Sequence, residues 1–169
     1  MKAYLGVGTN IGNLLENVKN AIKLLISNRS IKTLHASSLY ITEPVGVVEQ
    51  QDFLNGVFFV ETELSQQELF LVLKEIEKSM GRKKTVKYGP RIIDLDILLY
   101  EDKIYQDLDI TIPHPHLHKR SFVLWPLCEL SKDLIHPLFM KTVDMLKSEL
   151  VNPTKVKLLE TKWFPGRFK

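Results

Sequence analysis

Two amphipathic segments, at residues 14–27 and 65–80, carry the pattern that most constrains how this chain can fold. In both, apolar residues recur every three to four positions after a capping residue, Asn13 or Ser65, that has a glutamate three positions later. This combination is typical of amphipathic helices. β-rich stretches lie around them at 3–9, 31–40, 53–64 and 94–100. The order strand, helix, strand, strand, helix, strand is the split βαβ pattern, and it predicts a ferredoxin-like βαββαβ sandwich of the α+β class.

The last third of the chain predicts additions to this sandwich. Residues 121–127 and 142–150 have helical character, and residues 156–159 favour an edge strand after Asn152-Pro153. We therefore expect C-terminal helical and hairpin additions. The sequence predicts no element at 162–169 and reveals no role for the tail at 151–169.

Composition limits the organisation and the class of protein. A chain of 169 residues fits one domain, 1–169, and its apolar share of 44% and charged share of 25% are those of an ordinary globular protein. The net charge of +3 suits an anionic small molecule or a weak nucleic-acid contact. Cys128 is the only cysteine, so an intrachain disulfide is excluded. No secretory signal or membrane-length apolar run is visible, and we expect a cytoplasmic protein without membrane contact.

The β-rich stretch 94–100 carries two carboxylates. Asp94 and Asp96 are two positions apart, and side chains at that spacing project from the same face of a strand. Such a pair is stable when a divalent cation or basic groups neutralise it, and hard carboxylate oxygens without a nearby cysteine suit Mg²⁺ on phosphates better than zinc. The pattern alone leaves open a surface strand with two solvated acids.

Three other patterns have competing interpretations. A basic loop with Arg82, Lys84 and Lys87 fits a nucleic-acid patch, a solvated turn or, beside the acidic pair, a triphosphate site. The glycines of residues 6–12 lack the spacing of dinucleotide-binding or phosphate-binding loops, and we interpret this stretch as a turn. Asn55, inside an apolar stretch, needs hydrogen-bond partners from the backbone or from a ligand.

Three histidines alternate at His114, His116 and His118. Zinc is disfavoured here because Pro115 interrupts the strand geometry that would align them, and no cysteine or carboxylate completes a site within the run. We expect His116 and His118 to be surface residues.

The run K-x-G-P-R-x-x-D-L-D-I-L at residues 87–98 resembles the signature of the 6-hydroxymethyl-7,8-dihydropterin pyrophosphokinases, enzymes of folate biosynthesis. The resemblance extends over about residues 1–148 and includes the stretches 4–10 and 38–46. It implies a ferredoxin-like fold and transfer of pyrophosphate from ATP to the hydroxymethyl group of the reduced pterin, with release of AMP. ATP is then the co-substrate, and two Mg²⁺ ions are the implied cofactors.

The resemblance also implies a role for particular residues. Asp94 and Asp96 would hold the metal. The implied catalytic residues are Arg82, Lys84, Arg91, Asp94 and Asp96. The implied ATP-binding residues are Lys74, Glu77, Lys84, Tyr88, Arg91, Ile97, Thr111, His114 and Arg120. The implied pterin-binding residues are Thr42, Pro44, Val45, Gly46, Phe53, Asn55, Asp94 and Phe122.

Three positions depart from the members of the family that can be compared. Tyr88 stands where those members have Trp, Asp109 where they have Arg, and Pro115 where they have Tyr. All three lie toward the nucleotide end, where the predictions are therefore less direct than at the pterin end. The other functions considered are a metal-dependent phosphohydrolase and a non-catalytic ferredoxin-like nucleic-acid-binding module. The latter lacks an RNP1-like run. We expect a monomer acting on small molecules and not on nucleic acid.

Overall fold

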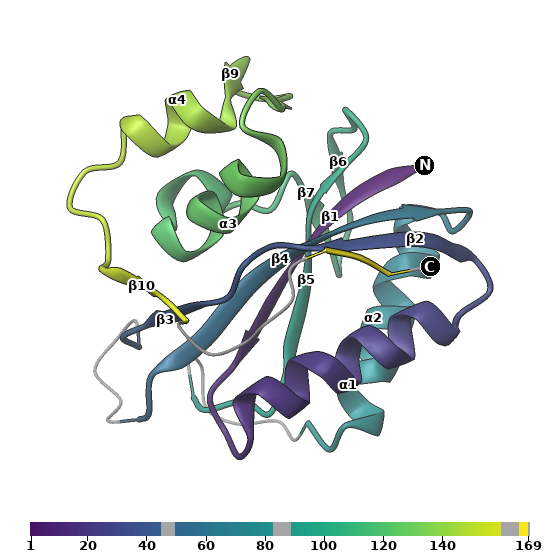
Figure 1. Cartoon of the computed structure of the whole chain (residues 1–169). Coiled ribbons are helices and arrows are strands. Elements are labelled where there is room, and N and C mark those ends of the chain that lie inside the picture. The colour runs from purple at the N-terminus through teal and green to yellow at the C-terminus, as the bar shows by residue number, and fades with distance from the viewer. Residues whose placement is uncertain (45–49, 83–88, 160–165, 169) are drawn as a thin grey trace.

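The computed structural model describes residues 1–44, 50–82, 89–159 and 166–168, and in these residues an antiparallel sheet of seven strands is the central layer (Figure 1). The helices are α1 (Leu14–Ser27), α2 (Gln66–Ser79), α3 (Ser121–Ser131) and α4 (Val143–Ser148), with a 3-10 turn η1 (Leu117–Lys119). The strands of the main sheet are β1 (Lys2–Thr9), β2 (Ile31–Ala36), β3 (Tyr40–Thr42), β4 (Phe53–Thr62), β5 (Asp94–Tyr100), β10 (Val156–Leu158) and β11 (Gly166–Phe168). Two small hairpins are formed by β6 (Tyr105–Gln106) with β7 (Thr111–Ile112) and by β8 (Ile135–His136) with β9 (Lys141–Thr142).

The strand order is β10-β3-β4-β1-β5, and β2 pairs with β4 and with β11. Every strand pair in this sheet is antiparallel. Strand β1 therefore lies between β4 and β5. In its register Gly8 is opposite Asn55 on one side and opposite Asp94 on the other. This register brings together residues that lie far apart in the sequence.

Helices cover both faces of the sheet. Helices α1 and α2 pack on one face through a core that includes Leu5, Leu25 and Leu73, all fully buried. Helices α3 and α4 pack on the opposite face, where Leu124 and Leu127 are fully buried. In Figure 1 α3 and α4 lie together on one side of the sheet, and α1 and α2 lie on the other. No helix in the described ranges is long and apolar enough to cross a membrane.

Local signals in the sequence placed both major helices well. The side chain of Asn13 accepts a hydrogen bond from the Glu16 N–H at the start of α1, and Ser65 with Glu68 forms a complete capping box at the start of α2. These contacts satisfy N–H groups that the first helical turn leaves without intrahelical partners. The prediction of both helix starts is confirmed.

The predicted strand at 31–40 is wrong in one respect, because two strands, β2 and β3, occupy this stretch with a break at residues 37–39. At the break the N–H and hydroxyl of Ser38 donate to the Glu129 carboxylate of α3, at 3.0 and 2.9 Å. The Tyr40 hydroxyl donates to the same carboxylate. These long-range contacts to α3 leave no local pattern in the sequence.

The interpretation of residues 6–12 as a turn is also wrong in part. Gly6 and Gly8 lie inside β1, and only the residues after Thr9 turn toward α1. Gly12 has a φ of +75°, which glycine adopts readily.

For the C-terminal elements, the type of secondary structure was predicted correctly but the bounds were not. Helix α3 continues through Pro126 to Ser131, beyond the predicted end at residue 127, and α4 is shorter than the predicted 142–150. The predicted edge strand is β10. The tail also forms β11, which the sequence did not predict.

Candidate active site

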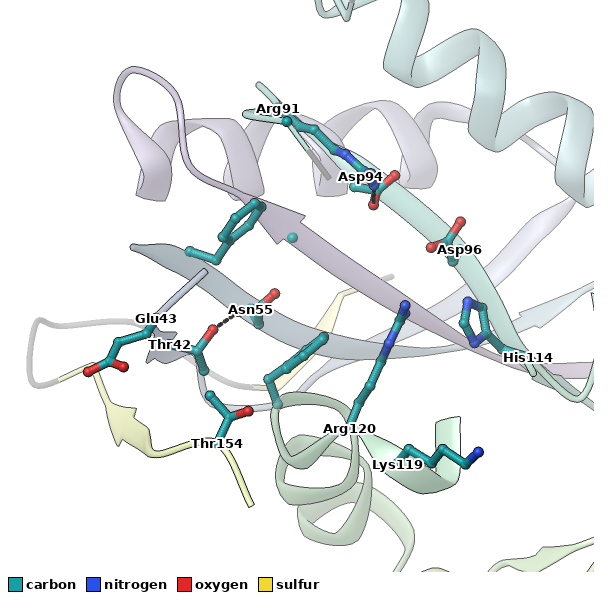
Figure 2. A pocket seen from close by; sticks show the side chains of 14 residues that line it. Thr42, Glu43, Asn55, Arg91, Asp94, Asp96, His114, Lys119, Arg120 and Thr154 are labelled. Atoms are coloured by element: carbon teal, nitrogen blue, oxygen red, sulfur yellow. Dashed lines mark hydrogen bonds and ion pairs between the residues drawn. The ribbon is translucent and has the colours of Figure 1, made fainter. Parts of the chain in front are cut away.

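A cavity of about 280 Å³ lies on the face of the sheet that carries α3, beside the N-terminal end of that helix (Figure 2). It brings together residues from β1, β3, β4 and β5 and from the turn before α3. Of the predicted site residues it is lined by Thr42, Phe53, Asn55, Arg91, Asp94, Asp96, His114, Arg120 and Phe122. It is also lined by Gly8, Glu43, Gly89, Lys119 and Thr154, which the sequence did not single out as site residues.

Gly8 keeps the floor of this cavity open. It lies between Asn55 of β4 and Asp94 of β5, and a Cβ atom at this position would come within 3.0 Å of the Asn55 side-chain oxygen. That distance is shorter than side-chain contacts normally allow. Gly8 could have been predicted as a site residue from strand alternation only if the register of β1 with β4 and β5 were known. The sequence alone does not give that register.

Asp94 and Asp96 line the cavity together, as strand alternation predicted. Arg82 reaches one carboxylate oxygen of Asp94 at 2.8 Å, and Arg91 pairs with the other. Asp96 is the more open of the two, with 39% of its side chain exposed, and has Lys74 at 3.5 Å. Asp94 is therefore neutralised by two guanidinium groups, while Asp96 faces solvent and has one more distant cation.

Lys74 and Glu77 of α2 lie at the outer edge of β5. Glu77 is buried and accepts a hydrogen bond of 2.7 Å from the Leu95 N–H, and Lys74 donates to the Leu95 carbonyl at 2.8 Å. Glu77 also pairs with Lys74 at 2.8 Å and with Arg82. An edge strand leaves backbone groups unpaired on its outer side, and here two side chains of α2 satisfy them. The pair thereby fixes the backbone between the two aspartates.

Asn10 fixes the position of Arg91. Its backbone N–H donates to the Arg91 carbonyl at 3.0 Å, and its side-chain oxygen accepts from the Arg91 N–H at 2.7 Å. Its amide nitrogen donates to Gln50 and to the Gln51 carbonyl. Asn10 is almost fully buried, and its hydrogen bonds are therefore partly shielded from water. It was not predicted as a site residue, although it closes the stretch 4–10.

The opposite end of the cavity is less charged. The buried amide of Asn55 donates to the Thr42 hydroxyl at 2.7 Å, which joins β4 to β3. Phe53 and Phe122 line the same cavity from β4 and from α3. The guanidinium of Arg120 lies 5.7 Å from the centre of the Phe122 ring. This end combines an amide, a hydroxyl and two aromatic rings with the Glu43 carboxylate beside Thr42, a set suited to a flat heterocycle with a polar edge.

His114 lies near Asp96 and is held as a neutral ring. Burial lowers its pKa below the ordinary value, and although Asp96 acts in the opposite sense, the nearby charges of Arg120 and His116 add to the lowering. The His116 N–H donates to Nδ1 of His114 at 3.1 Å. In a neutral ring the proton therefore sits on Nε2, which makes that atom a hydrogen-bond donor.

Other predicted site residues lie outside the cavity. The side chain of Ile97 belongs to the core beneath α2, and Thr111 and Pro44 are half-buried without lining the cavity. Their predicted ligand contacts stay predictions. Lys84, Tyr88, Val45 and Gly46 fall outside the described residues.

Two departures from the family pattern can be located in the structure. Asp109 and Pro115 are exposed and do not line the cavity.

His118 is not the surface residue we expected, because it is half-buried with its ring centre 4.6 Å from that of Phe139.

The acidic pair suits a hard divalent cation that arrives with phosphates. No group of three or more histidine, cysteine or acidic side chains that could enclose a metal occurs among the described ranges. Mg²⁺ commonly takes one or two carboxylates and completes its shell with water and substrate phosphates. The oxygens of Asp94 and Asp96 at an open cavity match that requirement.

Comparison with known proteins gives a consistent picture. Residues 4–132 match the family model of the 7,8-dihydro-6-hydroxymethylpterin-pyrophosphokinases (HPPK). The chain is 40% identical over 146 residues to the 2-amino-4-hydroxy-6-hydroxymethyldihydropteridine pyrophosphokinase of Aquifex aeolicus, an alignment that covers 86% of this chain and 90% of that protein. It is 48% identical over 135 residues to the folic acid synthesis protein fol1 of Schizosaccharomyces pombe, which covers 80% of this chain.

A solved structure of an HPPK-DHPS protein in complex with substrates matches with a TM-score of 0.67 at 14% identity over 87% of this chain. At that identity the likeness concerns the fold. The chain spans only part of two of these relatives, 18% of fol1 and 42% of the HPPK-DHPS chain.

Proposed function

The chain belongs to the 7,8-dihydro-6-hydroxymethylpterin-pyrophosphokinase family, and from this premise we propose that it transfers the pyrophosphoryl group of ATP to 6-hydroxymethyl-7,8-dihydropterin. The products are the pterin diphosphate and AMP, and the reaction serves folate biosynthesis. One observation carries this proposal. A single cavity has two aspartates and several cationic side chains at one end, and an amide, a hydroxyl, two aromatic rings and the Glu43 carboxylate at the other.

The end with Asn55 receives the pterin. Asn55 and Thr42 offer a donor and acceptors to the polar edge of the ring, and Phe53 and Phe122 contact its faces. Because Asn55 already donates to Thr42, one of its amide hydrogens and its oxygen are available for the ligand. A heterocycle that lacks the matching edge would leave these buried groups unpaired, which gives selectivity.

The end with Asp94 receives the triphosphate. Arg82 and Arg91 both pair with Asp94 in this structure. A bound nucleotide with Mg²⁺ would offer a cation to Asp94 and anionic oxygens to the two arginines, so each of the three side chains would exchange one charged partner for another. Arg120 and the Nε2 donor of His114 add positive potential at the same end. Positioning and charge neutralisation of this kind are the main contributions of a protein to phosphoryl transfer.

Two Mg²⁺ ions would be held between Asp94, Asp96 and the phosphates. A divalent cation held there would supply charge neutralisation for the phosphates. The protein's own contribution is to keep both carboxylates on one rigid strand, since the Leu95 backbone between them is bonded to Lys74 and Glu77.

The outer edge of β5 is a suitable place for the adenine base. The N–H and carbonyl of Leu95 point outward to α2, and backbone direction alternates along an antiparallel strand, so those of Ile97 also face the outer edge. The register with β1 shifts after Ile97, so Leu98 breaks the alternation, and its carbonyl accepts from the His114 N–H at 2.9 Å, which covers the next part of the edge. A backbone N–H and carbonyl are one donor and one acceptor, which suit the hydrogen-bonding edge of a purine. This reconciles the predicted role of Ile97 with its buried side chain.

The fold proposal follows from strand order. When β2 and β3 are counted as one broken strand, the four main strands lie in the sheet in the order β2/β3, β4, β1, β5, which is the second, third, first and fourth strand along the chain. All are antiparallel, and α1 and α2 cover one face. This supports a ferredoxin-like βαββαβ sandwich with α3, α4 and the tail as additions. A monomeric state and a cytoplasmic location stay predictions from the sequence.

The direct test is product identity with ATP, Mg²⁺ and the hydroxymethyl dihydropterin. AMP that forms only in the presence of the pterin supports pyrophosphoryl transfer. Pterin-independent release of inorganic phosphate would instead indicate a metal-dependent phosphohydrolase that uses the same acidic pair.

A further inference from the structure

The segment 151–159 crosses from α4 to the edge of the sheet, where β10 lies beside β3 (Figure 1). It lies beyond residues 4–132, which match the family model, and the sequence assigned it no role. Yet Thr154 lines the cavity, and Figure 2 places it close to Thr42 and Glu43. A part of the chain outside the family signature therefore contributes to the wall of the site.

The segment is anchored to the first residue of α3. The Ser121 hydroxyl donates to the Thr154 carbonyl at 2.7 Å, and Ser121 is only 2% exposed. Ser121 lies between Arg120 and Phe122, which both line the cavity. This partly buried hydrogen bond holds the Thr154 backbone beside the aromatic wall, and the burial of Ser121 limits the access of competing water.

The segment is also anchored to the sheet. Strand β10 pairs with β3, with Val156 opposite Thr42, and the Leu159 N–H donates to the Leu39 carbonyl at 2.8 Å. Strand β3 has three residues, and without β10 its outer side would be a free edge. Pairing on both sides, with β4 and with β10, therefore holds the backbone of Thr42 in place.

We propose that residues 151–159 form a wall of the pterin-binding end, in which Thr154 contacts the ligand and β10 positions Thr42. The inference rests on the proposed function, because it names a further contact of the same substrate. A threonine hydroxyl can donate and accept, so it fits the polar edge of the heterocycle that Asn55 and Thr42 also face. Among the described residues that line the cavity, Thr154 is the one from this segment, and it lies at the pterin end and not at the triphosphate end.

Thr154→Val tests the contact, because valine keeps the shape of threonine and removes its hydroxyl. We expect the KM for the pterin to rise about 3- to 10-fold, the range of one lost hydrogen bond, while kcat and the KM for ATP stay within about twofold. Thr154→Ser retains the hydroxyl and should restore most of the pterin affinity. An unchanged pterin KM in Thr154→Val would overturn the proposal, as would an equal rise in the KM of both substrates.

Lys157→Pro tests the positioning by β10. Since Leu159 and Leu39 form a hydrogen-bonded pair, Lys157 and Ile41 form the next such pair along the ladder, and proline removes the Lys157 donor. The side chain of Lys157 is exposed, so Lys157→Ala is a matched control that keeps the backbone N–H. We expect a higher pterin KM in Lys157→Pro alone, with the ATP KM unchanged; identical behaviour of the two variants would refute the role of β10. If Lys157→Pro does not fold, the comparison of Thr154→Val with Thr154→Ser still tests the proposal.

The same experiments separate this inference from the proposed function. If the wild-type protein forms AMP with the pterin, and Thr154→Val and Lys157→Pro have the same pterin KM as the wild type, only the role of residues 151–159 is refuted. Wild-type protein that forms no AMP would refute the proposed function, and the wall would fall with it.

Discussion

Glu77→Gln gives a sharp test of how the acidic pair is supported. The resemblance predicts Glu77 as an ATP contact, whereas the structure shows its side chain only 4% exposed and bonded to the Leu95 N–H, Lys74 and Arg82. Glutamine keeps an acceptor for Leu95 but removes the negative charge, and its amide N–H₂ would face the Arg82 guanidinium, donor against donor. We therefore expect a loss of folding stability.

The magnitude follows from the exposure of the partners. Breaking a fully buried ion pair by removing one partner costs about 3–5 kcal/mol. Lys74 and Arg82 are 31% and 26% exposed, so water compensates part of the loss. We expect the free energy of unfolding to fall by about 2 kcal/mol, which in a domain of this size lowers Tm by about 4–8 °C. The value of kcat should also fall, because the backbone between Asp94 and Asp96 loses support.

The assay is thermal and urea unfolding of Glu77→Gln without ligands, with Glu75→Gln as the control. Glu75 lies on the same helix but is exposed, so its substitution should leave Tm unchanged. An unaltered Tm in Glu77→Gln, combined with a higher KM for ATP, would refute the support role and favour direct nucleotide contact.

Three further predictions concern single side chains. Asp96→Asn should retain the fold and lower kcat about 1,000-fold, roughly 4 kcal/mol of transition-state stabilisation; near-normal turnover would contradict its assignment to the metal. Asn55→Ala should weaken pterin binding about tenfold or more in a calorimetric titration and leave ATP binding unchanged, and equal weakening of both would indicate a folding defect. Burial lowers the pKa of His136 to about 4, so the neutral ring is favoured in the folded protein and protonation favours unfolding. The free energy of unfolding should therefore fall, by on the order of 2 kcal/mol, as the pH drops from about 6.5 toward about 4; His136→Gln should flatten this dependence in urea titrations, whereas the exposed His116→Gln should not, and an equal slope in His136→Gln would contradict the argument.

The parts of the fold with local signals could be predicted from the sequence. The caps at Asn13 and Ser65 located both long helices, and the polarity pattern located β5 at residues 94–100. The break between β2 and β3 could not be predicted, because it depends on Glu129, ninety-one residues from Ser38 along the chain. Long-range hydrogen bonds of this kind override local strand propensity.

The site divides in the same way. The spacing of Asp94 and Asp96 placed both carboxylates on one face of a strand, and the resemblance of residues 87–98 to the family signature assigned them to a site. Gly8 could not be recognised, because its role depends on the register that places Asn55 and Asp94 on either side of it. Thr154 lies at the site because β10 pairs with β3. This pairing could not be predicted, because a strand of three residues has too short a pattern in the sequence.

The central claim is that this cavity transfers the pyrophosphoryl group of ATP to the pterin. It is tested most directly by chromatography of the products from ATP, Mg²⁺ and 6-hydroxymethyl-7,8-dihydropterin, with Asp94→Asn as the control for the acidic pair. We predict AMP and pterin diphosphate in equal amounts from the wild-type protein, and about 1,000-fold slower formation of both from Asp94→Asn. ADP with inorganic phosphate, or AMP formed without the pterin, would contradict it.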